Sequence, residues 1–544
     1  MRAIDFLLSL CFAPVLWYNT NQGIYRYIIF ICFDEKIAEQ VQGLQGVLVK
    51  VKRKVLLIIP HQDDELFVGG GLLKSFAQSR EYDVYVVFTT NGDFFPGEGE
   101  VRLTESLHVL TQLYAIEEAH IFFLGYGDGW KSDRHLYNHN GSRVVESEAG
   151  RRETYGTDGH EDYRYIKSGR HSAYCRDNFN CDLKGVISDL TADIIIAVDY
   201  DKHPDHKAAS LMTEECIGEL LKEKSDYHPL VLKRYAYDGV WKGKADFFDM
   251  PRKRTSLSQK EHSPYGEEER ICIAMPPECS TPLLGRNFLY AALKCYRTQE
   301  IWKKADEIIN IDEVYFKRNT NNLLYSAQLE ASSGNAEYIR DFKLFDCGDV
   351  LQKELVIAEC AWIPDAYDST RKIHIHFTAP QTIEQINIYA LGNSERDILE
   401  GEFVFDSGMR LSTGNLCLNG TKNPFTFHAQ RNVMDIDFYL INCTGSPQGI
   451  TEMEILSSCD RTIPEELQPL LFQGDTLEDT VYNRIVMKVE KLLFMLKRKV
   501  SWWVPNEYSL KRQYPELRDK SRLISFYRIK YILDRIRSKR SKSI

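Results

Sequence analysis

The chain has 544 residues, of which 43% are hydrophobic, 12% aromatic and 27% charged, and this mixture excludes a disordered, collagenous or low-complexity protein. A mean hydropathy of −0.35 excludes a polytopic membrane protein, and a formal net charge of −10 argues against nucleic-acid binding along the whole chain. A chain of this length is expected to form two to four domains.

Thirteen cysteines are spread thinly along the chain, and no two of them form a Cys-x-x-Cys pair. This pattern is neither that of a disulfide scaffold nor that of a zinc finger. It predicts reduced, structural thiols in a cytoplasmic protein.

Two apolar runs near the start, residues 6–18 and 24–33, are each shorter than the roughly 20 residues of a membrane-spanning helix. Arg2 precedes the first run as in a signal peptide, but Asp5 intrudes and no small-x-small cleavage site follows. Residues 1–50 are therefore expected to form a buried or surface-lying apolar segment, with a signal or an anchor as the alternative.

Short apolar runs then alternate with helical patterns. Runs typical of strands buried on both faces of a sheet occur at residues 55–59, 84–88, 121–124 and 194–198. Between the second and the third, apolar residues share one face of a helix over 101–114. The alternation predicts an α/β fold with a Rossmann-like, doubly wound parallel sheet, in a domain assigned to residues 51–326.

The loops after these four runs read PHQDDE, TTNGD, GYGDGW and DYDKHPDH. All four are polar and rich in Asp or His. In open sheets of this kind, ligands bind outside the carboxyl ends of the strands. The sequence therefore predicts a functional site formed by these loops.

Two of the loops carry residues with the spacing of metal ligands. His61 and Asp64 are three residues apart, and His203 and His206 would lie about one turn apart if HPDH opens a helix. Two imidazoles and one carboxylate make a complete set for a catalytic zinc with one open position, and Asp63 is then available as a general base. The same set also suits an iron(II) oxygenase, and Asp and His at strand ends also serve as turn and cap residues.

PHQDDE with a downstream HPDH resembles the motifs of the PIG-L/LmbE-type N-acetylglucosaminyl deacetylases, whose first motif is usually (P/A)HPDDE. The resemblance covers about half of the chain. It implies zinc ligation by His61, Asp64 and His206. It also implies that Asp63 is the catalytic base and that His203 assists the carbonyl and its oxyanion.

Three further positions relate to the same family. Gln62 stands where the family usually has Pro, a change that alters the loop backbone and removes no ligand. The family commonly places an Arg and an Asp on sugar hydroxyls, and Arg102 and Asp128 occupy those places. A solvated first-turn position is the alternative for Arg102, whereas the glycines beside Asp128 place it in a tight loop at the pocket rim.

Residues 337–459 have a different pattern. Alternating segments at 372–377, 384–389, 403–405 and 435–441 predict short strands of an antiparallel β-sandwich. IEQINIYALGN and ITEMEILSS give this region a resemblance to galactose-binding-like sandwiches of the discoidin and carbohydrate-module type. A packing module without a ligand is the alternative, and no site residue is assigned here.

The C-terminal residues 461–544 are predicted to be a helical, basic tail. Residues 481–544 contain 18 Lys and Arg against 5 Asp and Glu, a net charge of +13, so the first 480 residues carry −23. The stretch 481–500 combines an apolar face with basic residues, and Trp502 and Trp503 follow it. Such a helix can lie on an anionic membrane, and the alternative is a helix packed on the acidic body. The tail shows no nucleic-acid-binding motif, so nucleic acid is not expected as a partner.

The resemblance and the ligand pattern together imply a zinc-dependent hydrolase. Its expected substrate is an N-acetylglucosamine-like amino sugar in a glycan or glycolipid precursor, from which it removes the N-acetyl group. One alternative is a catalytically inactive carbohydrate-binding scaffold, against which the intact ligand set and Asp63 argue. The other is a non-heme iron(II) oxygenase, which metal analysis would separate.

Overall fold

The computed structural model describes residues 15–20, 23–28, 51–129, 136–139, 141–237, 248, 255, 264–348, 359–393, 397–444, 448–458, 463–474, 478–518 and 520–541. Of the expected N-terminal apolar segment, residues 1–14 and 29–50 lie outside the described residues. The described part of that segment is an antiparallel hairpin of β1 (Val15–Thr20) and β2 (Gly23–Ile28).

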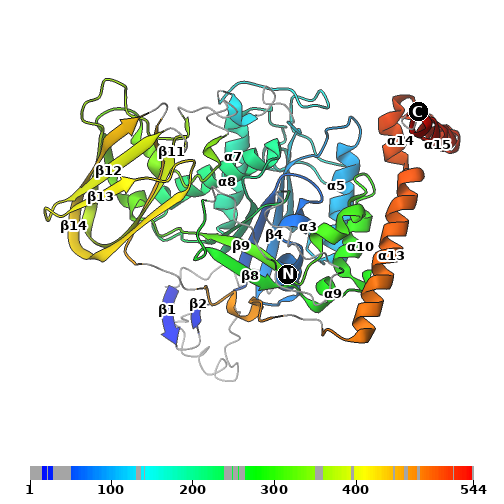
Figure 1. Cartoon of the computed structure of the whole chain (residues 1–544), viewed down its shortest axis with the longest axis horizontal. Helices are drawn as coiled ribbons and strands as arrows, with labels where there is room; N and C mark the ends of the chain where they lie inside the picture. The colour runs from blue at the N-terminus through cyan, green and yellow to red at the C-terminus, as the bar shows by residue number, and fades with distance from the viewer. Residues whose placement is uncertain are drawn as a thin grey trace, which may run out of the picture.

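A seven-stranded sheet lies at the centre of the larger part of the molecule, in the order β5-β4-β3-β6-β7-β9-β8 (Figure 1). The strands are β3 (Arg53–Ile59), β4 (Tyr82–Thr90), β5 (Ile121–Tyr126), β6 (Ile194–Val198), β7 (Leu230–Arg234), β8 (Arg270–Ala274) and β9 (Asp312–Arg318). The first five in this order pair in parallel, whereas β9 pairs antiparallel with both β7 and β8. The sheet is therefore mixed: the expected parallel pairing does not extend to β9 and β8, because an apolar run indicates burial and not the direction of pairing.

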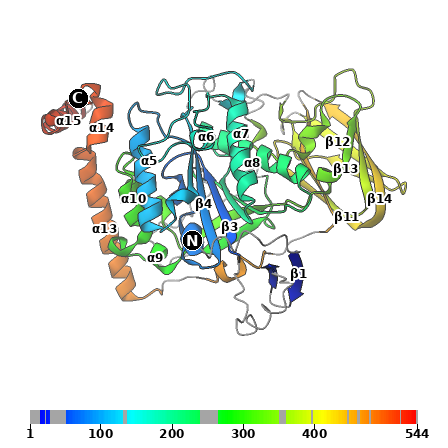
Figure 2. The same cartoon turned by 180° about the vertical axis from the view of Figure 1, so that it is seen from behind.

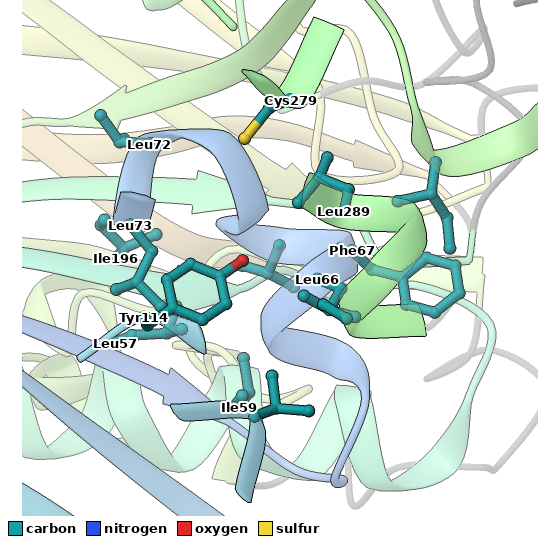
Figure 3. Close-up of a cluster of buried hydrophobic side chains, with 14 of the residues drawn as sticks. Leu57, Ile59, Leu66, Phe67, Leu72, Leu73, Tyr114, Ile196, Cys279 and Leu289 are labelled. Atoms are coloured by element: carbon teal, nitrogen blue, oxygen red, sulfur yellow. The ribbon is translucent and has the colours of Figure 1, made fainter. Parts of the chain in front are cut away.

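Helices cover both faces of this sheet. Leu57 and Ile59 of β3 belong to a core shared with α4 (Gly70–Gln78) and α10 (Phe288–Cys295) (Figure 3), and with α5 (Gly99–His108). Leu56 and Ile58 belong to a second core shared with α7 (Arg176–Leu190) and α8 (Pro204–Glu223). Successive side chains of a strand point to opposite faces, so β3 is buried on both. Among the described residues, the other α-helices of this part are α3 (Asp64–Val68), α6 (Tyr163–Ser168), α9 (Pro277–Ser280) and α11 (Ala305–Ile308).

A second, antiparallel sheet forms a separate part of the chain, in the order β10-β11-β14-β12-β13 with β15 paired to β11. Its strands are β10 (Gln328–Ala331), β11 (Lys372–Leu391), β12 (Ile398–Phe405), β13 (Arg410–Asn415), β14 (Lys422–Thr444) and β15 (Gly449–Leu456). The segments 372–377 and 384–389, expected as two strands, are halves of β11, and register shifts between His376 and Gln385 bend it. Both halves contribute to one core, so the sheet folds over its own apolar interior.

The C-terminal part of the described residues contains the α-helices α13 (Val481–Trp503), α14 (Glu507–Gln513) and α15 (Ile524–Ser541). α13 runs along the side of the larger part that lies away from the second sheet (Figures 1 and 2). Met487 and Phe494, seven residues apart, are its buried side chains, and both join the core that contains α4 and α10. In the described part of the chain, no helix is both long and apolar enough to cross a bilayer.

Buried polar residues join the two sheets. Glu214 of α8 pairs with Arg318 of β9 and lies 3.3 Å from Nζ of Lys233, and all three side chains are almost completely buried. Arg318 also donates to the carbonyl oxygen of Phe342 at 2.6 Å, and Glu214 accepts the backbone N–H of Leu344 at 3.1 Å. One carboxylate thus lies between two buried cations and also holds the start of the second part of the chain.

Glu214→Gln should destabilise the protein strongly, because it leaves Lys233 and Arg318 buried beside a neutral amide. We expect a loss of about 3–5 kcal/mol in the free energy of unfolding, measured by denaturant or thermal unfolding. The control is Glu223→Gln on the same helix, whose exposed carboxylate pairs with Lys184 and should contribute less than about 1 kcal/mol. Equal stability of the two variants would contradict this account.

Candidate active site

Two neighbouring strands bring the two predicted motifs together. β3 and β6 pair in parallel, so PHQDDE and DYDKHPDH leave the same edge of the sheet. The chain order reverses between these strands, since β4 lies on the far side of β3 and β7 on the far side of β6. Such a reversal opens the crevice in which open α/β sheets bind their ligands.

The three predicted metal ligands meet in this crevice. His61 Nδ1 lies 3.0 Å from Asp64 Oδ2, Asp64 Oδ2 lies 3.2 Å from His206 Nε2, and His206 Nε2 lies 3.3 Å from His61 Nδ1. Four-coordinate zinc with bonds of about 2.0–2.2 Å needs donor atoms about 3.3–3.5 Å apart. The buried triangle therefore has nearly the size that such an ion requires.

Two overlapping sets of side chains share His61. The ligand atoms of His61, His203 and His206 all lie within 4.8 Å of one another, as do those of His61, Asp128 and Asp205. Among the described residues, Oδ1 of Asp64 and Oδ1 of Asp128 are buried without a hydrogen-bond partner. Buried carboxylate oxygens of this kind need a partner, so the cluster fits a cation as its missing neighbour.

Two further carboxylates orient the imidazole rings. Asp201 Oδ2 lies 2.8 Å from His206 Nδ1, and Asp205 Oδ2 lies 3.3 Å from His61 Nε2. A proton on each of these ring nitrogens leaves His206 Nε2 and His61 Nδ1, the triangle atoms, with their lone pairs for a metal. The sequence alone did not assign a role to either residue, although both belong to the motif DYDKHPDH. The spacing of Asp and His residues in a motif does not show which of them bind a metal and which only orient the ligands.

The predicted base, Asp63, is held in an unusual backbone conformation beside the triangle. Its φ of 117° is rare for a residue with a side chain, and its N–H donates to Glu65 Oε2 at 3.0 Å. Glu65 is itself buried and bound by the hydroxyl of Tyr296. Burial raises the pKa of Asp63 to about 7, against the opposing charge of Arg102. A carboxylate with such a pKa suits proton transfer near neutral pH.

Arg102 is buried in the site, which excludes the alternative of a solvated first-turn residue. Its guanidinium donates to the carbonyl oxygens of Gly92 at 2.9 Å and Gln62 at 2.8 Å, and Nη2 lies 3.6 Å from Asp63 Oδ1. Gly92 has a φ of 61°, and a Cβ there would lie 2.5 Å from the guanidinium carbon, so only glycine fits. Arg102 thus joins the loops after β3 and β4 beside the base.

His203 begins α8 as its N-cap residue, and Pro204 occupies the first turn as expected. His203 Nδ1 accepts the backbone N–H of Asp205 at 3.2 Å. Burial, together with the neighbouring His61 and His206, lowers the pKa of His203 to about 3. The ring is therefore neutral and carries its proton on Nε2, in the form that can donate to a developing oxyanion.

These residues open into a cavity of about 300 Å³. It is lined by His61, Asp63, Phe94, Phe95, Arg102, Asp128, His203, Asp205, Tyr237 and Gln299. Asp64 and His206 are fully buried and contact His61, which lines the cavity. Asp128 accepts the N–H of Phe94 at 3.2 Å and lies 3.9 Å from His61 Nε2, so it reaches the ligand cluster as well as the cavity.

Aromatic walls are the part of the cavity that the sequence did not reveal. The ring of Tyr237 stacks on that of His206 with centroids 4.6 Å apart, and Phe94 packs edge-on against Phe95. A larger cavity, of about 860 Å³, lies where the two sheets meet, at the amino ends of β3, β6 and β7. Its described lining includes none of the predicted site residues, so the smaller cavity is the candidate active site.

The comparisons with known proteins agree with the family motifs. Residues 56–217 match the PIG-L family model, described as GlcNAc-PI de-N-acetylase. This match confirms the resemblance over the segment that carries both motifs, and the family's description is that of a deacetylase. No curated protein matches the chain.

Solved structures similar to parts of the chain include two kinds of protein. One is a deacetylase–teicoplanin complex from the teicoplanin biosynthesis pathway, with 14% identity over 48% of this chain and 97% of that one and a TM-score of 0.28. Another is the family 32 CBM from C. perfringens NanJ in complex with galactose, with 13% identity over 25% of this chain and 97% of that one and a TM-score of 0.19. These identities and scores are too low to transfer any property to this chain.

Asp201→Asn should weaken metal binding, because it removes the negative charge that fixes the ring of His206. Loss of such an outer partner lowers metal affinity about 10- to 100-fold, which competition with a chromophoric chelator would measure. Asp158→Asn, at an exposed aspartate, is the matched control. Unchanged affinity in Asp201→Asn would show that this carboxylate does not support the metal site.

Proposed function

We propose that the protein is a zinc-dependent hydrolase that removes the N-acetyl group from an N-acetylglucosamine-like amino sugar in a glycan or glycolipid precursor. The observation that carries the proposal is the buried triangle of His61, Asp64 and His206 with Asp63 beside it in a cavity. The PIG-L match over the same segment supports the reaction class. The substrate rests on the family resemblance and on the hydrogen-bonding groups of the cavity.

The architecture supports different functions for two parts of the chain. We assign catalysis to residues 51–326, as a Rossmann-like, doubly wound domain, and we assign residues 337–459 to a galactose-binding-like module. The parallel strands and their reversal of order between β3 and β6 favour the first assignment. A cytoplasmic location is part of the proposal, and it rests on the sequence, in which thirteen cysteines are thinly spread without a Cys-x-x-Cys pair.

His61, Asp64 and His206 would hold the metal ion. The chemistry that bound zinc supplies is Lewis acidity toward the amide carbonyl and toward water. Asp63 accepts a proton from the attacking water and later returns one to the departing amine. His203 donates a hydrogen bond from its Nε2–H to the oxyanion that develops on the carbonyl oxygen.

Arg102 and Asp128 have the chemistry to position a sugar. Both line the cavity, and together they present N–H donors and carboxylate acceptors, which match the hydroxyl groups of a pyranose ring. Arg102 also reaches Asp63, so it links sugar binding to the base. In the proposal, these two residues hold the amino sugar with its acetamide toward Asp63 and His203.

The metal assignment is tested by loading the purified protein with zinc and measuring metal by mass spectrometry. The unmodified protein should hold about one zinc per chain, and His61→Ala, Asp64→Ala and His206→Ala should each abolish tight binding. Full zinc occupancy in all three variants would contradict the ligand set. Retention of iron with rejection of zinc would favour an oxygenase instead.

Asp63→Asn separates the base from the ligands. We expect this variant to retain zinc while its rate of acetate release from N-acetylhexosamine glycosides falls about 10²- to 10⁴-fold, because the proton acceptor is lost. Asp158→Asn should keep both metal and activity. An Asp63→Asn variant as active as the unmodified protein would remove Asp63 from catalysis, and no acetate release by the unmodified protein from any glycoside of a broad panel would overturn the proposed substrate.

A further inference from the structure

Helix α13 has two apolar faces. The narrower face packs on the part of the molecule around the seven-stranded sheet, here called the body, and the broader face points outward. Met487 and Phe494 are buried against the body, where Phe494 contacts Tyr290 and Trp302. On the opposite side, Ile485, Val489, Leu492, Leu496 and Val500 follow one another at helical spacing, and all are at least half exposed. The outward face is therefore an apolar stripe along the full length of a 23-residue helix.

Helix α15 also has an exposed apolar face. Phe526, Ile529, Leu533 and Ile536 are spaced three, four and three residues apart, so they share one face, and all four are exposed. α15 is tied to the end of α13, because Arg535 donates to the carbonyl oxygen of Trp502 at 2.8 Å. Two joined helices thus expose apolar faces far larger than scattered surface residues would give.

Basic residues border the apolar stripe of α13. Arg484, Lys488 and Lys499 are exposed and lie at one edge of the stripe, and Trp502 is 58% exposed at its end. The segment 481–544 carries a net charge of +13, in contrast to −23 on the rest of the chain. An apolar stripe with a basic edge and a terminal tryptophan complements an anionic lipid surface, into which the apolar groups enter while the cations meet the headgroups.

A second copy of the chain is a poorer occupant of the same faces. Pairing two such tails would bring +13 against +13, and like charges across an interface oppose association. The acidic body is repelled by an anionic bilayer, so the charge distribution also selects which side of the molecule faces it.

Helix α14 fixes this surface relative to the active site. Arg512 pairs with Glu98, stacks on the ring of Phe95 at 4.4 Å and donates to the carbonyl oxygen of Thr298 at 3.0 Å. Phe95 and Gln299, the neighbour of Thr298, line the active-site cavity. Helix α14 therefore contacts the wall of the active-site cavity through Arg512.

We propose that the outward apolar faces of α13 and α15 are a docking surface for an anionic membrane, held by α14 in a fixed position relative to the active site. This inference goes beyond the proposed function and stands without it, because it rests only on the exposed faces, the charges and the contacts of the tail. Neither helix needs to span the bilayer. Each would lie in its headgroup layer.

The test is co-sedimentation of the full chain with vesicles of phosphatidylcholine alone or mixed with phosphatidylserine. Binding should require phosphatidylserine and should weaken between about 0.1 M and 1 M salt, where the screening length falls from about 10 Å to about 3 Å. Leu492→Glu combined with Leu496→Glu should reduce binding about tenfold or more, because both side chains leave the apolar layer and add negative charge. The matched control is Ile441→Glu, an exposed apolar residue on the second sheet, which should bind as the unmodified chain does.

Circular dichroism and light scattering complete the experiment. Unchanged helical content in the double variant shows that the loss is local, as expected for side chains exposed in the folded chain. No binding of the unmodified chain, equal binding to both kinds of vesicle, or equal binding by the double variant would overturn the proposal. A dimer that Leu492→Glu and Leu496→Glu dissolve would show instead that a second copy covers the stripe.

Discussion

The parallel pairing of β3 with β6 is the constraint on which the rest of the site depends. These two strands belong to segments more than 100 residues apart, and their pairing places the ends of both at one edge of a buried sheet. His61 and Asp64 come from the first segment and His206 from the second, so the triangle exists only if the register of the pair is correct. Burial of β3 on both faces, in two separate cores, fixes that register.

Burial also sets the protonation of the two residues proposed to act on the substrate. It raises the pKa of Asp63 to about 7 and lowers that of His203 to about 3, because a low-dielectric site disfavours the charged form of each. One cavity therefore holds an acid–base group poised near neutral pH beside a neutral hydrogen-bond donor. Active sites commonly shift the pKa values of two neighbouring groups in opposite directions, so that one group transfers protons while the other keeps a fixed protonation state.

The sequence predicted the parts of the fold and site that depend on local pattern. Four apolar runs became β3, β4, β5 and β6, and the two motifs after the first and last of them meet in space. It did not predict the antiparallel direction of β9 or the continuity of β11 through its bend, since both depend on which strand lies alongside. Asp201 shows the same limit, because its role depends on the partner that it reaches in the folded chain.

Anomalous X-ray diffraction from a zinc-loaded crystal tests the central claim most directly. The account predicts a single strong peak about 2.0–2.2 Å from each of three atoms, His61 Nδ1, Asp64 Oδ2 and His206 Nε2, with Asp201 and Asp205 outside the coordination sphere. A peak bound instead by Asp128 and Asp205, on the Nε2 side of His61, would contradict it.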